Sequence, residues 1–330
     1  MKVWDLHCDT LSELRYAEND GRSLSFANND LQMDLERMKQ GDYLLQCFAC
    51  FVNLGRKNEN PLVSCMEMID IFYRLLDEYA EDLVMIRTPE DIRALPGSGK
   101  IGAMLPVEEG GVCLDDIRIL RNLYRLGVRM MTLTWNHENG LAWPNSVPGN
   151  AYNVWPCSPV TDHGLTMKGF EFVEEMERLH MILDVSHLSD GGFWDVARLA
   201  KKPFIASHSN CRALNPHPRS LTDEMIRALA DRGGVMGLNF LPGFLTADTE
   251  ETHCSVDALA AQLRHRINTG GLECAAIGTD FDGISGTFEI PSAGHMPELF
   301  DGLLKRGFTP YELDRISFRN VERVFRDTIG

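Results

Sequence analysis

The chain opens with Val3-Trp4-Asp5-Leu6-His7-Cys8-Asp9-Thr10, a short and mainly apolar run. Runs of this length and composition are typical of a buried strand. Because alternate residues of a strand point to the same face, we expect His7 and Asp9 to project together. An imidazole nitrogen and a carboxylate oxygen on one face are suitable ligands for a divalent metal ion. Taken alone, so short a pattern is more simply explained as a core histidine beside a helix-capping aspartate, so the rest of the chain must decide.

The composition of the chain limits its class. With 330 residues, 44% of them hydrophobic and 24% charged, it can bury a large core as one α/β barrel or as two ordinary domains. The net charge of −16 argues against nucleic acid or an anionic membrane surface as a partner. The sequence shows neither a signal-peptide pattern nor an apolar run that could span a membrane, and its nine cysteines are an odd number. We therefore expect a cytoplasmic protein with free thiols and no membrane association.

Short apolar runs that end in polar residues alternate with segments of helical periodicity. The expected strands cover residues 3–10, 43–53, 100–109, 129–135, 181–187, 204–210, 234–240 and 275–282. The expected helices cover residues 29–39, 62–79, 115–126, 167–179, 190–200, 222–230, 255–268, 296–306 and 310–326. This alternation favours a (β/α)8 TIM barrel over a doubly wound sheet, which the same pattern also permits. Because no linker or repeat divides the chain, we expect residues 1–330 to form one barrel domain with a C-terminal helix.

Residues able to bind a metal gather at the ends of five expected strands. They are His7, Asp9, Glu108, Glu109, His187, His208, Asp280 and Asp282. In a TIM barrel the carboxyl ends of the strands form one rim, and the active site is built there. Each of these side chains has an ordinary structural explanation, but five strands that converge with His, Asp and Glu are hard to attribute to chance. The sequence therefore predicts a metal centre at this rim.

The motifs that carry these residues resemble those of the renal (membrane) dipeptidase family, which belongs to the amidohydrolase superfamily of metal-dependent barrels. The matching segments are His7-Cys8-Asp9, Val107-Glu108, Leu133-Thr134, Asp184-Val185-Ser186-His187, Ser207-His208-Ser209 and Gly278-Thr279-Asp280-Phe281-Asp282-Gly283. Each segment is short, but together they run in order along essentially the whole chain, as far as Asn320-Val321. The resemblance implies a TIM barrel of the metal-dependent hydrolase type.

The resemblance further implies a site with two Zn²⁺ ions. Its ligands would be His7 and Asp9 for the first metal, His187 and His208 for the second, and Glu108 for both. The residues alone leave Glu108 and Glu109 open, because neighbours on a strand face opposite ways, whereas the family pattern selects Glu108. The same ligands would also accept manganese, cobalt or iron.

The expected chemistry follows from two adjacent metal ions. A hydroxide that bridges them at near-neutral pH would attack the carbon of a peptide carbonyl. A carboxylate nearby must then move a proton to the leaving amine. We expect Asp282 in this catalytic role, because it matches the family aspartate of strand eight, with Asp280 as the competitor on the same face. Either residue can also be explained as one that orients a ligand or the loop backbone.

Two further residues are candidates for substrate binding. Arg219 matches the family arginine that contacts substrate, and a guanidinium can bind a carboxylate with two hydrogen bonds. Without the resemblance it would be interpreted as a surface arginine. Mammalian members of the family carry a substrate-contacting histidine where this chain has Trp135. We expect His137, two residues further on, to take its place; otherwise the contact is absent or supplied by an asparagine.

These inferences predict a binuclear zinc dipeptidase that hydrolyses the amide bond of dipeptides. Members of the family accept a D-residue at the C-terminal side, so such substrates are expected, and a homodimer is expected on the same ground. Deacylation of an N-acyl amino acid is the nearest alternative, and it differs because its substrate lacks a free ammonium group. A catalytically silent barrel that serves as a binding subunit is the alternative from another class. The complete set of expected ligands disfavours that alternative.

Overall fold

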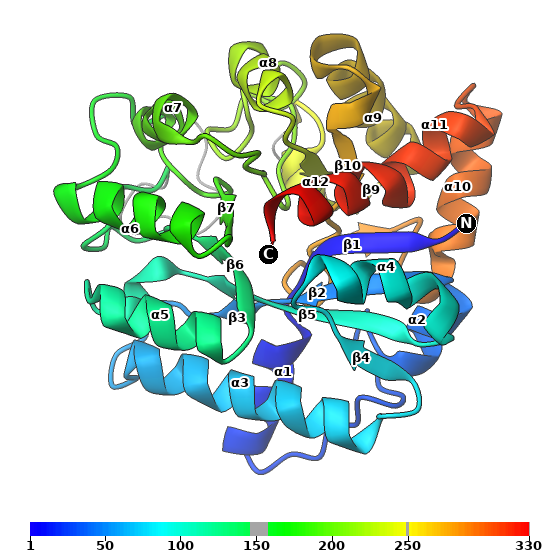
Figure 1. Ribbon diagram of the computed structural model, residues 1–330. Helices are drawn as coiled ribbons and strands as arrows, with labels where there is room; N and C mark the ends of the chain where they lie inside the picture. Colours follow the sequence, from blue (N-terminus) through cyan, green and yellow to red (C-terminus); the bar gives the residue numbers. More distant parts are fainter. Residues whose placement is uncertain (146–157, 249–250, 330) are drawn as a thin grey trace.

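The computed structural model describes residues 1–145, 158–248 and 251–329, and it shows parallel strands curled into a TIM-like barrel (Figure 1). Neighbouring strands follow the order β7-β6-β5-β2-β1-β10-β8. Their bounds are β1 Val3–Cys8, β2 Tyr43–Phe48, β5 Ile101–Glu108, β6 Val128–Thr132, β7 Ile182–Asp184, β8 Met236–Leu238 and β10 Ala275–Ile277. Parallel bridges from Asp184 to Ile205 and from Ala206 to Met236 connect the two outer strands of this order. The expected barrel fold is confirmed.

The expected strand at residues 204–210 is reduced to these two bridges. Its pairing with β7 stops because the backbone N–H of Ser207 donates to Oδ1 of Asp184, at 2.9 Å, and not to a carbonyl of that strand. On the side of β8, the N–H of Ser209 still donates to the carbonyl oxygen of Gly237. A side-chain acceptor thus interrupts the ladder where the chain turns toward the barrel rim. This interruption places His208 at the rim, directly after the last bridged residues.

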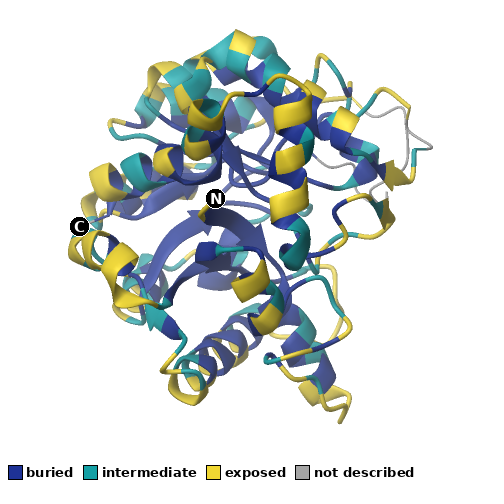
Figure 2. Cartoon of the chain, turned by 90° about the vertical axis from the view of Figure 1, so that its right-hand side faces the viewer, coloured by how far each residue is buried: buried dark blue, intermediate teal, exposed yellow. Residues whose placement is uncertain are grey.

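Helices follow the strands and cover the outside of the barrel, with their exposed faces turned outward (Figure 2). They are α1 Thr10–Asn19, α2 Leu35–Gln40, α3 Pro61–Glu78, α4 Pro89–Ser98, α5 Ile117–Arg125, α6 Met167–Arg178, α7 Asp190–Leu199, α8 Asp223–Asp231, α9 Val256–Gly270, α10 Met296–Lys305, α11 Pro310–Asp314 and α12 Asn320–Thr328. The short strands are β3 Cys50–Phe51, β4 Leu83–Met85, β9 His253–Cys254 and β11 Thr287–Phe288. No helix among the described residues is long and apolar enough to cross a membrane.

Five helices and strands of the described residues are absent from the sequence-based expectation: α1, β4, α4 and the two-residue strands β9 and β11. Helix α1 begins at Thr10, within the run that was expected to be strand, and buries Leu11 and Leu14. Helix α4 starts with a capping box in which Thr88 and Asp91 satisfy each other's backbone N–H groups. The unit β4–α4 lies beside the first half of β5, where Leu83 pairs with Ile101.

The C-terminal segment closes the amino end of the barrel. Trp4, near the start of β1, stacks on Phe318 with ring centroids 6.0 Å apart and meets Phe325 edge-on at 5.2 Å. The expected terminal helix is interrupted by a π-helical turn at Arg315–Arg319, between α11 and α12. These aromatic side chains fill the amino end of the barrel, so the rim at the carboxyl ends of the strands remains available for a site.

Candidate metal centre and active site

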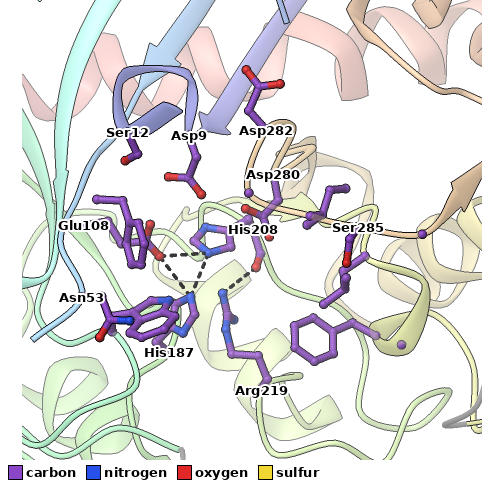
Figure 3. A pocket seen from close by; sticks show the side chains of 18 of the residues that line it. Asp9, Ser12, Asn53, Glu108, His187, His208, Arg219, Asp280, Asp282 and Ser285 are labelled. Atoms are coloured by element: carbon purple, nitrogen blue, oxygen red, sulfur yellow. Dashed lines mark hydrogen bonds and ion pairs between the residues drawn. The ribbon is translucent and has the colours of Figure 1, made fainter. Parts of the chain in front are cut away.

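Glu108 lies at the centre of a buried cluster at the carboxyl end of the barrel (Figure 3). Its Oε2 is 3.2 Å from Nε2 of His7, which stands near the end of β1. Its Oε1 is 3.1 Å from Nε2 of His187 and 3.4 Å from Nε2 of His208. Oδ1 of Asp9, the residue that follows β1, is 3.8 Å from Nε2 of His7. The structure therefore brings together the five residues expected to be metal ligands.

The cluster divides into two groups that share Glu108. One consists of His7, Asp9 and Glu108, and the other of Glu108, His187 and His208, and within each group the ligand atoms lie within 4.8 Å of one another. Because the two oxygens of the Glu108 carboxylate face different groups, this residue can contact two neighbouring cations at once.

The donor atoms of the cluster fit a divalent metal ion. Nε2 of His7 and Oδ1 of Asp9 are buried and have no hydrogen-bond partner among the described residues. Nε2 of His187 and Nε2 of His208 face each other at 3.0 Å. Burial and the charge of Arg219 lower the pKa of His187 to about 4, so its imidazole is neutral, which is the form that binds metals. Buried polar atoms that converge without partners are costly unless a cation joins them.

Hydrogen bonds on the outer side orient the two histidines of the second group. Nδ1 of His187 is 2.9 Å from Oδ1 of Asn136. Nδ1 of His208 is 2.7 Å from Oγ of Ser207, which in turn donates to Oδ2 of Asp184 at 2.5 Å. Contacts of this kind fix the tautomer and leave Nε2 free to bind a metal. Asp184 and Ser207 stood in the matched motifs without an assigned role, and nothing in the sequence singled out Asn136.

Glu109 faces away from the cluster. Its backbone has φ of 106°, a value rare for a residue with a side chain, and this turns its carboxylate from the histidines. The carboxylate accepts hydrogen bonds from the backbone N–H groups of Trp135, at 2.9 Å, and Gly111, at 2.7 Å, and from the side chain of Asn139. Burial raises its pKa to about 7. Of the two glutamates left open by the strand pattern, Glu108 is thus the one among the histidines, and Glu109 holds the loop that follows β6.

Asp280 lies beside the metal-ligand cluster. Its Oδ1 is 3.8 Å from Nε2 of His7, and its Oδ2 accepts a hydrogen bond from Nδ2 of Asn239 at 2.8 Å. The side chain can also be grouped with His7 and His208 as a possible ligand set. Burial raises the pKa of this carboxyl group to about 6, although the charge of His7 acts in the opposite direction.

Asp282 has a different surrounding, although it also lines the cavity. Its Oδ2 accepts a hydrogen bond from Oγ1 of Thr10 at 2.6 Å. Its Oδ1 accepts from the backbone N–H groups of Gln32, at 2.8 Å, and Met33, at 3.1 Å. In Figure 3 its carboxylate points away from the histidines and Glu108. Oδ2 thus ties the loop after β10 to the start of α1, and Oδ1 ties it to the segment before α2.

Arg219 is buried, with 6% of its surface exposed, and lines the cavity. Its guanidinium donates to Oγ of Ser209 at 2.7 Å and to the carbonyl oxygen of His208 at 2.9 Å. The interpretation as a surface arginine does not fit this burial. Contact with the backbone of His208 ties its position to that of the metal-ligand cluster.

The carbonyl group of Pro218, the residue before Arg219, is held by a partly buried ion pair. Arg212 donates two hydrogen bonds of 2.7 Å to Asp190, from Nη1 to Oδ2 and from Nη2 to Oδ1. The carbonyl oxygen of Pro218 accepts from Arg212 at 2.9 Å and from Asn145 at 2.9 Å. Asn145 also donates to Asp190 at 2.6 Å. This clamp of Asn145, Asp190 and Arg212 was not foreseen from the sequence, and it fixes the loop that carries Arg219.

A cavity of about 610 Å³ opens above the cluster. Trp135 lines it and packs edge-on against Phe51, with ring centroids 4.9 Å apart. His137 is not among the described residues that line the cavity. Its Nε2 is instead 3.1 Å from Oδ1 of Asn53, whose side chain does line it. Trp135 therefore forms part of the cavity wall, whereas His137 contacts Asn53, another residue of that wall.

A family profile described as "Membrane dipeptidase (Peptidase family M19)" matches residues 1–329. The chain belongs to the membrane dipeptidase family. It is thus a metallo-dipeptidase, as the motifs led us to expect. Two proteins with sequences similar to this chain are an uncharacterised protein encoded 5′ of pqqA in Klebsiella pneumoniae and an uncharacterised dipeptidase of Schizosaccharomyces pombe. The first is 32% identical over 269 residues, which cover 81% of this chain and 97% of that protein. The second is 32% identical over 310 residues, which cover 89% of this chain and 72% of that protein.

Two solved structures of metallopeptidases have the same fold. A metallopeptidase from Rhodobacter sphaeroides, liganded with a phosphinate mimic of the dipeptide L-Ala-D-Ala, matches with a TM-score of 0.91 and 25% identity over 99% of each chain. The dipeptidase AC, a metallopeptidase of family M19, matches with a TM-score of 0.91 and 26% identity over 100% of this chain and 99% of that one. The solved structures therefore support the TIM-like barrel, and the family profile supports the family.

Proposed function

We propose that this metallo-dipeptidase hydrolyses free dipeptides at a centre of two divalent metal ions. The observation that carries the proposal is the buried cluster in which Glu108 is shared by two groups of ligands. His7 and Asp9 would hold the first ion, His187 and His208 the second, and Glu108 both. Bound there, the ions supply Lewis acidity for the peptide carbonyl and lower the pKa of the attacking water. Zinc suits this mixed set of imidazole and carboxylate ligands.

We assign the transfer of the proton to Asp280 in place of Asp282. Asp280 borders the cluster and has a pKa of about 6, so it can accept a proton from the attacking water and give it to the leaving amine. Both oxygens of Asp282 are already engaged by Thr10, Gln32 and Met33. Asp282 would act by holding the loop on which Asp280 stands.

We propose that Arg219 binds the C-terminal carboxylate of the dipeptide. A buried guanidinium in the wall of the cavity offers a fixed positive charge to that group. His137 would contribute indirectly, by holding the side chain of Asn53 at the wall. The phosphinate mimic bound to the Rhodobacter sphaeroides relative supports acceptance of a D-residue at the C-terminal side.

The test is a measurement of metal content together with hydrolysis of matched substrates. These are L-Ala-L-Ala, L-Ala-D-Ala and N-acetyl-L-Ala-D-Ala, with and without a chelator. We expect about two zinc ions per chain and chelator-sensitive cleavage of the free dipeptides. Cleavage of N-acetyl amino acids with no cleavage of dipeptides would move the activity to deacylation. Absence of both metal and turnover after addition of zinc would favour a silent binding subunit.

A further inference from the structure

Glu13 is a carboxylate in the wall of the cavity that the proposed mechanism does not use. It lies on α1, four residues after Asp9 and therefore about one helical turn further from the metal-ligand cluster. Its side chain is half-buried, and burial raises its pKa. Its carboxylate has no hydrogen bond or ion pair with another described residue. A half-buried carboxylate that faces a cavity without a partner is suited to a cation that enters from outside.

The two arginines whose charges act on Glu13, Arg22 and Arg56, already have partners of their own. Arg56 stacks over the ring of Tyr16 at 4.1 Å and lies 3.4 Å from Oε1 of Glu59. Arg22 lies 3.4 Å from Oδ2 of Asp20. Their charges act on Glu13 only from beyond ion-pair distance, since no salt bridge joins either one to it. Glu13 is therefore a carboxylate of this wall that feels two positive charges but forms an ion pair with neither.

The position of Arg219 indicates which end of a dipeptide faces Glu13. In Figure 3, Arg219 lies on one side of His187 and His208, whereas Asp9 and Ser12 lie on the other. If Arg219 binds the C-terminal carboxylate, the N-terminal residue extends toward α1. A second pocket of about 380 Å³ shares Glu13, Tyr16 and Arg56 with the main cavity, so a long side chain has room to extend in this direction.

We propose that Glu13 selects dipeptides whose N-terminal residue carries a positively charged side chain. The inference rests on the proposed dipeptidase function and on the proposed role of Arg219. The distance of one helical turn from Asp9 favours the terminal ammonium or guanidinium of a lysine or arginine side chain over the α-ammonium, which stays close to the scissile bond. Glu13 would thus be a specificity-determining residue.

The experiment compares two substrates of equal chain length, L-Lys-D-Ala and L-norleucyl-D-Ala, on the zinc-loaded enzyme. We expect kcat/KM for the lysyl dipeptide to be about tenfold higher, the size of one charge-assisted contact at a half-exposed site. Glu13→Gln should remove this preference by lowering only the value for the lysyl dipeptide, and Glu13→Asp should retain part of it. Glu18→Gln is the matched control, because Glu18 lies on the same helix, binds Arg74 and does not line the cavity.

Several outcomes would overturn the proposal. One is equal kcat/KM for the two dipeptides on the wild-type enzyme. Another is an equal loss for both in Glu13→Gln, which would assign the α-ammonium to Glu13. Phosphinate analogues of the two dipeptides keep the test separate from turnover. If no dipeptide is cleaved but the lysyl analogue binds more tightly in a manner that needs Glu13, the proposed function fails while the specificity stands.

Discussion

A Cβ atom added to Gly283 would lie 2.0 Å from Oδ2 of Asp9 and 2.9 Å from Oδ1 of Asp280. Gly283 follows β10, and Asp9 follows β1, so the loops of two neighbouring strands touch at this point. Only a residue without a side chain allows the carboxylate of Asp9 to lie against this backbone. The glycine is therefore part of what places a candidate metal ligand beside His7.

Gly283→Ala should displace Asp9 and lower the affinity of the first metal site. We expect the variant to fold but to retain less than two metal ions per chain after dialysis, with a matching loss of activity. Metal content by mass spectrometry and the thermal unfolding midpoint check this. Gly97→Ala is the control, because a Cβ on Gly97, within α4, meets no atom within 4 Å and should leave both quantities unchanged. Full metal content in Gly283→Ala would contradict the prediction.

The strands and the metal ligands could be predicted because both follow from local patterns. Apolar runs show where the strands lie, and parallel strands must bring their carboxyl ends to one rim. His7, Glu108, His187 and His208 follow that rule, so topology alone collects them. The pairing of Asp184 with Ser207 and the clamp around Pro218 join segments far apart in the sequence, and no local pattern reveals such contacts.

The choice between Asp280 and Asp282 could not be made from the sequence, because strand β10 ends at Ile277. Beyond it, Asp280 and Asp282 have φ of 65° and 68°, in the left-handed region, where alternation between two faces no longer holds. His137 presents the same difficulty after β6. Its direction depends on its hydrogen bond to Asn53, a residue of a different loop.

Ser207→Ala should weaken the second metal site. The hydroxyl of Ser207 connects Asp184 to Nδ1 of His208, and loss of such outer contacts commonly lowers metal affinity about 10- to 100-fold. Competition with a metal-binding dye measures the change. Ser317→Ala is the control, because Ser317 is equally buried and its hydroxyl has no hydrogen-bond partner among the described residues. Equal affinity in the two variants would show that the contact to His208 has no such role.

Asp280→Asn and Asp282→Asn should differ in kind. Removal of the proposed proton carrier in Asp280→Asn should lower kcat about 10²- to 10⁴-fold, with metal content near that of the wild type. Asp282→Asn keeps one acceptor oxygen, so it loses the hydrogen bond either from Thr10 or from the backbone before α2, and its thermal midpoint should fall more than its kcat. Steady-state kinetics on both variants measures the change in kcat, and calorimetry measures the change in thermal midpoint. The reverse pattern would return the catalytic role to Asp282.

Glu175 should make the stability of the barrel depend on acid pH. Hydrogen bonds from Arg178 and Arg121 lower its pKa from 4.5 to about 2. Because the folded-state pKa lies below the unfolded one, the stabilisation is complete above about pH 4.5 and is lost as the pH falls toward 2. The free energy of unfolding of the metal-free protein can be measured with urea. The difference in this free energy between wild type and Glu175→Gln should therefore shrink as the pH is lowered from 6 to about 3. A difference independent of pH would contradict this origin. Glu171→Gln, an exposed change on the same helix, should have little effect at any pH.

Asp190→Asn should act on substrate binding through the clamp behind Arg219. The change weakens the paired hydrogen bonds to Arg212 and loosens the carbonyl of Pro218, so the guanidinium of Arg219 loses its fixed position. We expect KM for L-Ala-D-Ala to rise about tenfold, the equivalent of about 1.4 kcal/mol, with a smaller change in kcat. The matched substrate L-Ala-D-Ala amide lacks the carboxylate, so its KM should change little.

The double variant separates positioning from general loss of structure. If Asp190 acts only by placing Arg219, Asp190→Asn adds little to the defect of Arg219→Met, because residues that act through one another are not additive. Additive effects on KM, or an equal rise in KM for the amide substrate, would show that Asp190 stabilises the loop without directing Arg219 toward the substrate carboxylate. The thermal midpoint of each variant, measured in parallel, reports the cost of leaving the charge of Arg212 half-paired in a nearly buried position.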